Sequence, residues 1–239
     1  MFVPYRHINA IGVELEGGWE DEPCECHDLK GDGSVQVQAQ YVGEIPLGPF
    51  ASWRDAEESI RRHYPQVVNR TCGLHVHLSF PDNGHYSALM SQRFETFLWR
   101  RLMLYGKRKN FSADGQYFQR LTGKNFYCRH RWNDNRVMEQ ARMSYKDEAR
   151  YALINYCHRL HGTVEVRALP AFLRPASAVK AIKYLCDTFE RYLLLPGALV
   201  PDVYTADGTT ISGPGFPDEE IDYGVIGGDV DWNLAAEVR

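Results

Sequence analysis

The chain lacks long apolar runs and an excess of positive charge. None of its 239 residues belongs to a stretch approaching the roughly 20 apolar residues of a membrane-spanning helix. The opening segment, MFVPYRHINA, lacks the charged-then-apolar order of a secretory signal. Lysines and arginines number 27 against 31 aspartates and glutamates, so the formal net charge is -4. We therefore expect a cytoplasmic protein whose partners are small molecules or peptides, and neither membranes nor nucleic acid.

Cysteines are few and scattered. Six occur in the chain, too sparse for the disulfide-stabilised scaffold of a small secreted domain, and we expect reduced thiols. Cys24, Cys26 and His27 lie in the run CECH. Structural zinc sites usually combine two matching ligand pairs, and no second pair is present, so we do not expect zinc there.

Hydrophobic residues make up 44% of the chain, which is enough for a sizeable core. Strand-like alternation of apolar and polar residues occurs at 10–18, 33–46, 72–80 and 163–169. Helical patterns occupy 52–64, 87–105, 144–159 and 175–194, and a weakly patterned, cation-rich loop is expected at 106–142. The sequence predicts an α+β fold with one domain, residues 1–205, followed by an acidic, Gly/Asp-rich tail, residues 206–239.

Four of the predicted strands carry charged or imidazole side chains on one face. In the run GVELE, Glu14 and Glu16 project to one side while Val13 and Leu15 project to the other, because strand residues alternate. The polar sets are Glu14 and Glu16, then Glu44, then His75, His77 and Ser79, and then Glu165 and Arg167. Taken alone, an E-x-E pair commonly marks the solvated face of a sheet, and an H-x-H pair is often not a ligand. Four such sets together favour a functional site.

The predicted polar face carries too much negative charge to stay empty. Four glutamates and Arg167 leave a charge of -3 if the strands share one sheet. Each like-charged pair at ~4 Å costs several kcal/mol even at an effective dielectric constant near 20. Carboxylates with one or two imidazoles suit Mg²⁺ or Mn²⁺, so the pattern predicts a site for divalent cations.

Several motifs, in order along the chain, resemble those of one family. They are GVELE at 12–16, DGS at 32–34, GEIPLGP at 43–49, GLHVHLS at 73–79, RYALIN at 150–155 and GTVEVR at 162–167. This series resembles the amidoligases of the glutamine synthetase-like carboxylate-amine ligase superfamily. The resemblance implies a curved antiparallel β-sheet with helices packed on its outer face and the active site on its concave polar face. It also implies that ATP phosphorylates a substrate carboxylate and that an amine then displaces phosphate to form an amide or isopeptide bond.

The resemblance also implies roles for individual residues, with ATP and Mg²⁺ (or Mn²⁺) as cofactors. A metal at the ATP phosphates would be held by Glu14, His75 and Glu165. A second metal, nearer the acceptor carboxylate, would be held by Glu16 and Glu44. Arg167 would stabilise charge on the transferred phosphoryl group, and His77 would lie near the phosphates. Arg150 and Asn155 match the family's run before the last strand and lie five residues apart in the helix expected at 144–159.

Three further residues have two interpretations. Asp32 matches the family position that orients or deprotonates the amine, but Asp-Gly is also a common turn signal. Arg120 and Lys124 are candidate ligands of the triphosphate, but for either one a solvated basic loop is the more common explanation. Both interpretations remain open at this point.

The leading hypothesis is an ATP-dependent ligase that acts on an amino acid, a peptide or another small molecule. One alternative is a zinc-dependent hydrolase with His75, His77 and Glu165 as ligands. Another is a non-catalytic binding module on the same fold. A homo-oligomer is compatible with each of these hypotheses.

Overall fold

A computed structural model describes residues 5–23, 29–125, 128, 151–199, 203–204 and 210–211. Its strands are β1 (Ala10–Trp19), β2 (Tyr41–Phe50), β3 (Gly73–Ser79), β4 (Ile154–Tyr156), β5 (Val164–Pro170), β6 (Val203–Tyr204) and β7 (Thr210–Ile211). Its helices are α1 (Trp53–His63), α2 (Asn83–Leu89), α3 (Gln92–Arg108), α4 (Gln116–Leu121), α5 (His158–His161) and α6 (Pro175–Leu193).

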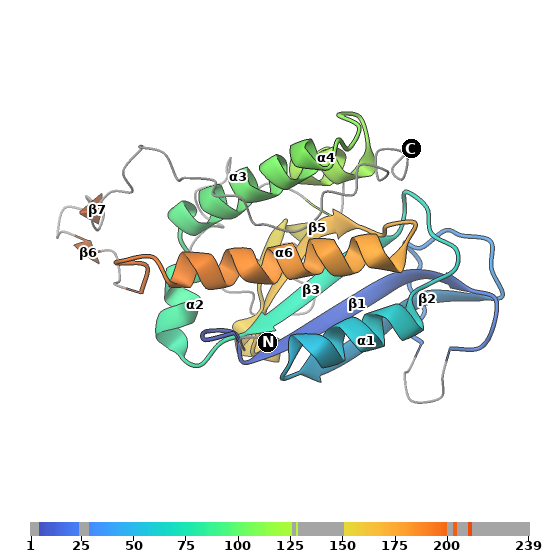
Figure 1. The fold of residues 1–239 in the computed structure, drawn as a ribbon, viewed down its shortest axis with the longest axis horizontal. Coiled ribbons are helices and arrows are strands. Elements are labelled where there is room, and N and C mark those ends of the chain that lie inside the picture. Colours follow the sequence, from blue (N-terminus) through green and yellow to red (C-terminus); the bar gives the residue numbers. More distant parts are fainter. Residues whose placement is uncertain are drawn as a thin grey trace.

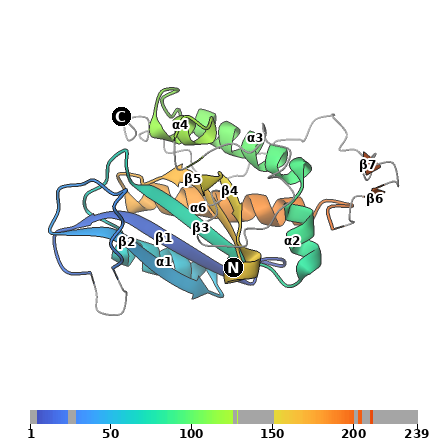
Figure 2. The same ribbon diagram turned by 180° about the vertical axis from the view of Figure 1, so that it is seen from behind.

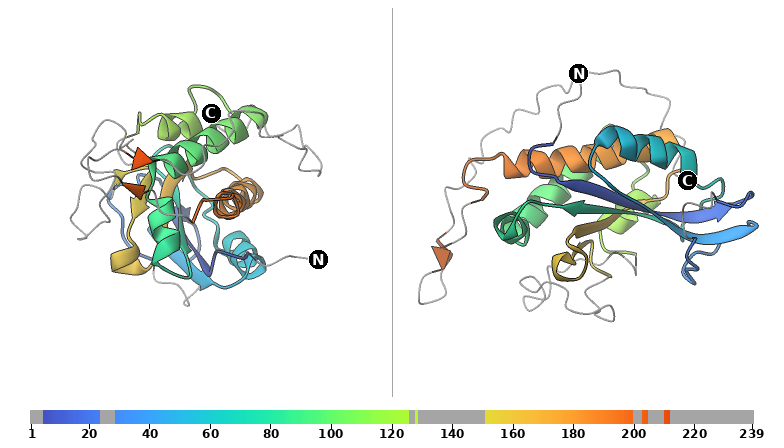
Figure 3. Two further views of the ribbon diagram at one scale, coloured as in Figure 1. Left: turned by 90° about the vertical axis from the view of Figure 1, so that its left-hand side faces the viewer. Right: turned by 90° about the horizontal axis from the view of Figure 1, so that it is seen from below.

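Five strands form one open antiparallel sheet in the order β2-β1-β3-β5-β4 (Figure 1). Helices α1 and α6 lie side by side on one face of this sheet, as the view from below in Figure 3 shows. Helix α4 contacts β5, and α3 contacts both α4 and α6. The predicted α+β class, with an antiparallel sheet and helices on its outer face, is confirmed at this level.

The alternation predicted from the sequence determines which face the helices cover. Val13 and Leu15 of β1 are each 1% exposed, and Val76 of β3 and Val166 of β5 are fully buried. These side chains join those of α1 and α6 in the hydrophobic core. The polar set of each strand consequently lies on the other face of the sheet, away from α1 and α6. Figure 2 shows the molecule from this side.

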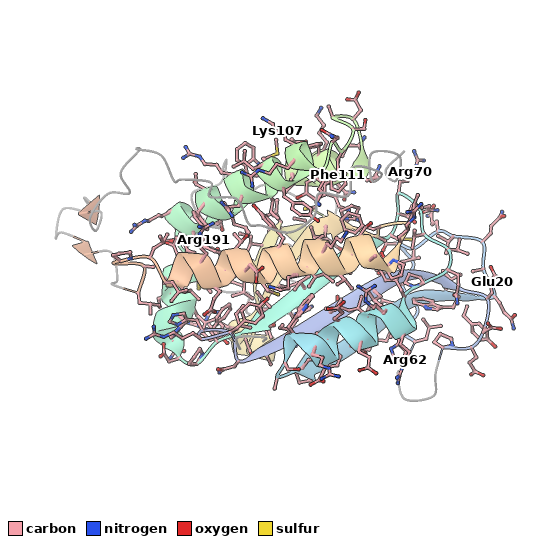
Figure 4. The ribbon with its side chains drawn as sticks, in the orientation of Figure 1. Glu20, Arg62, Arg70, Lys107, Phe111 and Arg191 are labelled. Carbon is pink, nitrogen blue, oxygen red and sulfur yellow. The ribbon has the colours of Figure 1, made fainter. Side chains whose placement is uncertain are left out.

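Local signals placed two helices correctly. Ser52 caps α1, because its side chain accepts a hydrogen bond from the backbone N–H of Asp55. The face of α1 that is turned away from the sheet is solvated. Arg62 points away from the sheet in Figure 4, and its side chain is 67% exposed. Pro175 begins α6, where its missing N–H would have had no helical partner.

The strand predicted at 33–46 was wrong in its first half, because β2 begins only at Tyr41. Residues 33–40 form turns and irregular structure. Their polar backbone groups are bonded by side chains instead of a neighbouring strand: Gln36 N–H donates to Thr71 Oγ1, and Asn69 Nδ2 donates to Gln36 O. The alternation of apolar and polar residues therefore predicted a strand that starts earlier than the one in the structure.

The single helix predicted at 87–105 is two helices, α2 and α3. Ser91 interrupts it, because its side chain accepts a hydrogen bond from Phe94 N–H and so caps a new helix. The loop predicted at 106–142 was also wrong where α3 continues to Arg108 and where residues 116–121 form α4.

The helix predicted at 144–159 was wrong where residues 154–156 form β4. Asn155 lies opposite Glu165 in the β4–β5 ladder, so strand pairing outweighed the helical pattern. Gly162 ends α5 in the left-handed conformation, with a φ of 68°.

The predicted tail, 206–239, lies outside the described residues except for Thr210 and Ile211, which pair with Tyr204 and Val203. Cys72, Cys128, Cys157 and Cys186 are free and buried. Among the described residues, no helix is long and apolar enough to cross a membrane.

Candidate functional site

Strand register brings the predicted polar residues together on the uncovered face. Glu14 lies opposite His75 between β1 and β3, and Glu16 lies opposite Glu44 between β1 and β2. His77 lies opposite Glu165 between β3 and β5. Residues as far apart in the sequence as Glu14 and Glu165 therefore lie on one polar surface.

Glu14, His75 and Glu165 form the first group of possible metal ligands. One ligand atom from each lies within 4.8 Å of the others. His75 Nδ1 lies 2.9 Å from Glu14 Oε2 and 3.6 Å from Glu165 Oε1. These are the three residues that the resemblance assigns to the metal at the ATP phosphates.

Glu16, Asp32 and Glu44 form a second group, with ligand atoms again within 4.8 Å of one another. Asp32 reaches it because Lys30 and Glu44 exchange two backbone hydrogen bonds of 2.9 Å, which hold the loop against β2. Asp32 also forms the turn that the Asp-Gly signal predicted, since its Oδ1 accepts from Ser34 N–H at 2.7 Å. The sequence had not indicated Asp32 as a possible third ligand beside Glu16 and Glu44.

His75 joins the two groups. Its Nδ1 faces Glu14, while its Nε2 lies 3.3 Å from Glu16 Oε1. The side chain is only 2% exposed, so the imidazole is held between carboxylates on both sides. One imidazole ring therefore contacts carboxylates of both groups.

Gly73 makes room for this arrangement. A Cβ at this position would lie 2.9 Å from His75 Nε2 and 3.0 Å from both Glu16 Oε2 and Arg120 Nη1. The Gly73 N–H also donates to Glu16 Oε2. The sequence analysis missed this residue, although it is part of the run GLHVHLS.

Two arginines, Arg167 and Arg120, lie beside the carboxylates of the site. Arg167 Nη1 donates to Glu165 Oε1 at 2.6 Å. Arg120 was expected in a flexible loop, but it lies in α4, is 2% exposed, and donates to the carbonyls of Cys72 and Arg167. Lys124 is exposed. Arg150 lies outside the described residues, as does the CECH run.

Three carboxyl groups of the site differ in the direction of their pKa shifts. Burial would raise the pKa of Glu14, but hydrogen bonding with His75 and the proximity of His77 outweigh it and hold the pKa well below its ordinary range. Burial would likewise raise the pKa of Glu165, but the Arg167 guanidinium outweighs it and lowers the pKa. Burial and the charge of Glu14 raise the pKa of Glu44 to about 7. A cation bound beside Glu44 would therefore favour its ionised form.

His77 lies beside the first group but is not one of its three ligands. Its Nδ1 lies 3.3 Å from Thr163 Oγ1, and its Nε2 lies 3.1 Å from Glu14 Oε1 without hydrogen-bond geometry. Burial would lower the pKa of His77, but the Cys157 thiol and the two neighbouring carboxylates outweigh it and raise the pKa well above its ordinary value.

Asn155 supports the first group from the edge strand β4. Its Nδ2 donates to Glu165 Oε2 at 2.6 Å, and its side chain is fully buried. The predicted helix had placed it five residues from Arg150 with no partner. A strand at 154–156 instead directs it to the same face as Glu165.

Comparisons of the chain with protein-family models, with curated proteins and with solved structures find no match. Function is therefore inferred from the residues of the polar face and their geometry. The chemistry available there is cation binding by two adjacent ligand groups, with Arg167 beside them.

Proposed function

We propose that the protein is an ATP-dependent carboxylate-amine ligase of the glutamine synthetase-like superfamily, with that superfamily's catalytic fold. The observation that carries the proposal is the pair of ligand groups, Glu14/His75/Glu165 and Glu16/Asp32/Glu44, joined through His75 on one sheet face. Two adjacent cation sites beside an arginine suit the transfer of a phosphoryl group, which requires positioning and charge neutralisation.

The donor atoms of both groups suit Mg²⁺ or Mn²⁺. Five of the six possible ligands are carboxylates and one is an imidazole. Hard oxygen ligands favour these ions over softer transition metals. When bound, the ions would neutralise the phosphates of ATP and orient the γ-phosphoryl group.

The proposed reaction has two steps. A substrate carboxylate oxygen attacks the γ-phosphorus of ATP, the bond to the bridging oxygen breaks, and an acyl phosphate and ADP form. The amine nitrogen then attacks the acyl carbon, the C–O bond to phosphate breaks, and an amide, phosphate and a proton are released. Arg167, which donates to Glu165 at 2.6 Å, would stabilise negative charge on the transferred group.

The pKa pattern supports roles in cation binding. Glu14 and Glu165 have lowered pKa values and are ionised at neutral pH, so they can bind a cation without first losing a proton. Glu44, with a pKa of about 7, would become fully ionised only when a cation binds beside it. The proposed substrates are small-molecule or peptide carboxylates and amines, and the proposed compartment is the cytoplasm.

The zinc-hydrolase alternative makes a different demand on the site. It needs His75 and His77 as joint ligands, but only His75 is in the first group of ligand atoms. Stoichiometric, tightly retained zinc without nucleotide binding would favour that alternative.

The test is ATP turnover by purified protein with Mg²⁺ and pooled carboxylates and amines. Wild type should release phosphate and form an amide, and should bind ATP in calorimetry. Glu165→Gln, which keeps the shape of the side chain, should reduce phosphate release by at least about 100-fold, because it removes an anionic metal ligand and the carboxylate that holds Arg167.

The matched control is Glu58→Gln on the solvated face of α1, where the side chain is 65% exposed. It should retain wild-type turnover. If wild type releases no more phosphate than Glu165→Gln across the substrate pool and binds no ATP, the ligase proposal is wrong.

A further inference from the structure

Asn155 carries a buried acceptor atom that has no donor. Its Oδ1 is shielded from solvent and makes no hydrogen bond, although the side chain is fully buried. Leaving such an atom unpaired costs roughly 1–3 kcal/mol, so a buried orphan acceptor calls for an explanation. The carboxamide lies on the polar sheet face, beside the proposed catalytic groups.

The orientation of this carboxamide is determined by its neighbour. Asn155 Nδ2 donates to Glu165 Oε2 at 2.6 Å, so the NH₂ group of the carboxamide faces the carboxylate. Consequently Oδ1 is directed away from Glu165 Oε2 and is the polar atom of the side chain that makes no hydrogen bond.

Asn155 contacts the oxygen of Glu165 that does not face His75 and Arg167. Glu165 Oε1 faces His75 Nδ1 at 3.6 Å and Arg167 Nη1 at 2.6 Å. Glu165 Oε2 faces Asn155. The Glu165 carboxylate thus lies between Asn155 on one side and His75 and Arg167 on the other.

A primary amine in its ammonium form matches this position. It supplies N–H donors for Asn155 Oδ1 and a positive charge for the adjacent Glu165 carboxylate, and such charge-assisted hydrogen bonds are strong. Resting on the proposed function, we propose that Asn155 forms the subsite for the ligase's amine substrate. Asn155 Oδ1 binds the amine on one side of the Glu165 carboxylate, and the acyl phosphate forms on the other side.

The experiment measures binding of methylammonium chloride to the full chain, with and without Mg²⁺ and a non-hydrolysable ATP analogue. Saturable broadening of the probe's methyl proton signal reports binding. Tetramethylammonium at the same ionic strength carries the same charge without N–H donors. In wild type, methylammonium should bind saturably under at least one condition and tetramethylammonium should not displace it.

Two substitutions test the residue. Asn155→Leu removes the whole carboxamide, and Asn155→Ser keeps a short donor for Glu165 but removes Oδ1. Each should weaken methylammonium binding about tenfold or more, the effect of losing one hydrogen bond to a charged group. The matched control, Asn83→Ser at the exposed start of α2, should bind as wild type does. Thermal unfolding establishes that each variant is folded.

A measurement on wild type alone decides the matter if both variants unfold. The ¹⁵N-labelled side-chain NH₂ signal of Asn155 should shift on addition of methylammonium and not on addition of tetramethylammonium. The inference is wrong if methylammonium does not bind, if both folded variants bind it equally well, or if tetramethylammonium competes equally. Binding needs no turnover, so its failure is distinguishable from loss of ATP-dependent phosphate release.

Discussion

At the residue scale, Gly73 leaves room for three polar side chains to approach one another. A Cβ added to Gly73 would lie 2.9 Å from His75 Nε2 and 3.0 Å from both Glu16 Oε2 and Arg120 Nη1. These neighbours are buried, and each has other partners on the sheet. Extra volume here must therefore displace the imidazole that joins the two ligand groups.

Gly73→Ala should destabilise the protein by about 1–3 kcal/mol, the usual effect of added volume in a packed interior. It should also weaken Mn²⁺ binding, measured by electron paramagnetic resonance, because His75 and Glu16 must move. Gly31→Ala is the matched control, since no atom lies within 4 Å of the added Cβ. Equal Mn²⁺ affinity in the two variants would contradict the role assigned to Gly73.

At the scale of elements, α4 connects two strands through one side chain. Arg120 donates to Cys72 O, just before β3, and to Arg167 O within β5. Near this point β5 has an extra residue relative to β3, between the pairs Leu74↔Leu169 and Val76↔Val166. Such a bulge redirects side chains and often lies beside functional sites, so α4 supports the position of Arg167.

Arg120→Leu should lower the free energy of unfolding by about 3–5 kcal/mol, because two buried carbonyls lose their donor and Glu16 loses a nearby positive charge. Urea denaturation measures the loss. Lys124→Leu, at an exposed position three residues beyond α4, should change stability by less than about 0.5 kcal/mol. Similar losses in both variants would show that Arg120 does not connect the strands.

At the scale of the whole molecule, the acidic face makes stability depend on pH and on cations. The folded-state pKa of Glu44 is about 7, above its ordinary value of 4.5. The folded protein therefore retains this proton longer than the unfolded chain. The contribution of Glu44 to stability is fully present below pH 4.5 and is lost as the pH rises through about 7.

A bound cation should reverse this loss. Mg²⁺ at about 100 times its dissociation constant should stabilise the protein by about 2.7 kcal/mol, or roughly 5–10 °C in the midpoint of thermal unfolding. Below pH 7 the ion competes with the Glu44 proton, so a fixed Mg²⁺ concentration should stabilise more at pH 8 than at pH 6. Glu44→Gln should remove this difference. If a sodium salt of equal ionic strength stabilises the protein as much as Mg²⁺ does, the proposal of a specific Mg²⁺ site is wrong.

The sequence by itself determined which residues face the core and which face the site. Val13 and Leu15 alternate with Glu14 and Glu16, and a strand must place such neighbours on opposite sides. Ser52 and Pro175 similarly positioned two helix starts through contacts within a few residues. These features were predictable because their causes are local.

The tertiary structure alone decided which distant residues complete the site. Asp32 joins Glu16 and Glu44 only because backbone bonds between Lys30 and Glu44 hold its loop against β2. Asn155 reaches Glu165 because pairing with β5 imposes a strand where the local pattern favoured a helix. Such positions depend on contacts between segments far apart in the chain, whose energies exceed the small local preferences that a sequence pattern expresses.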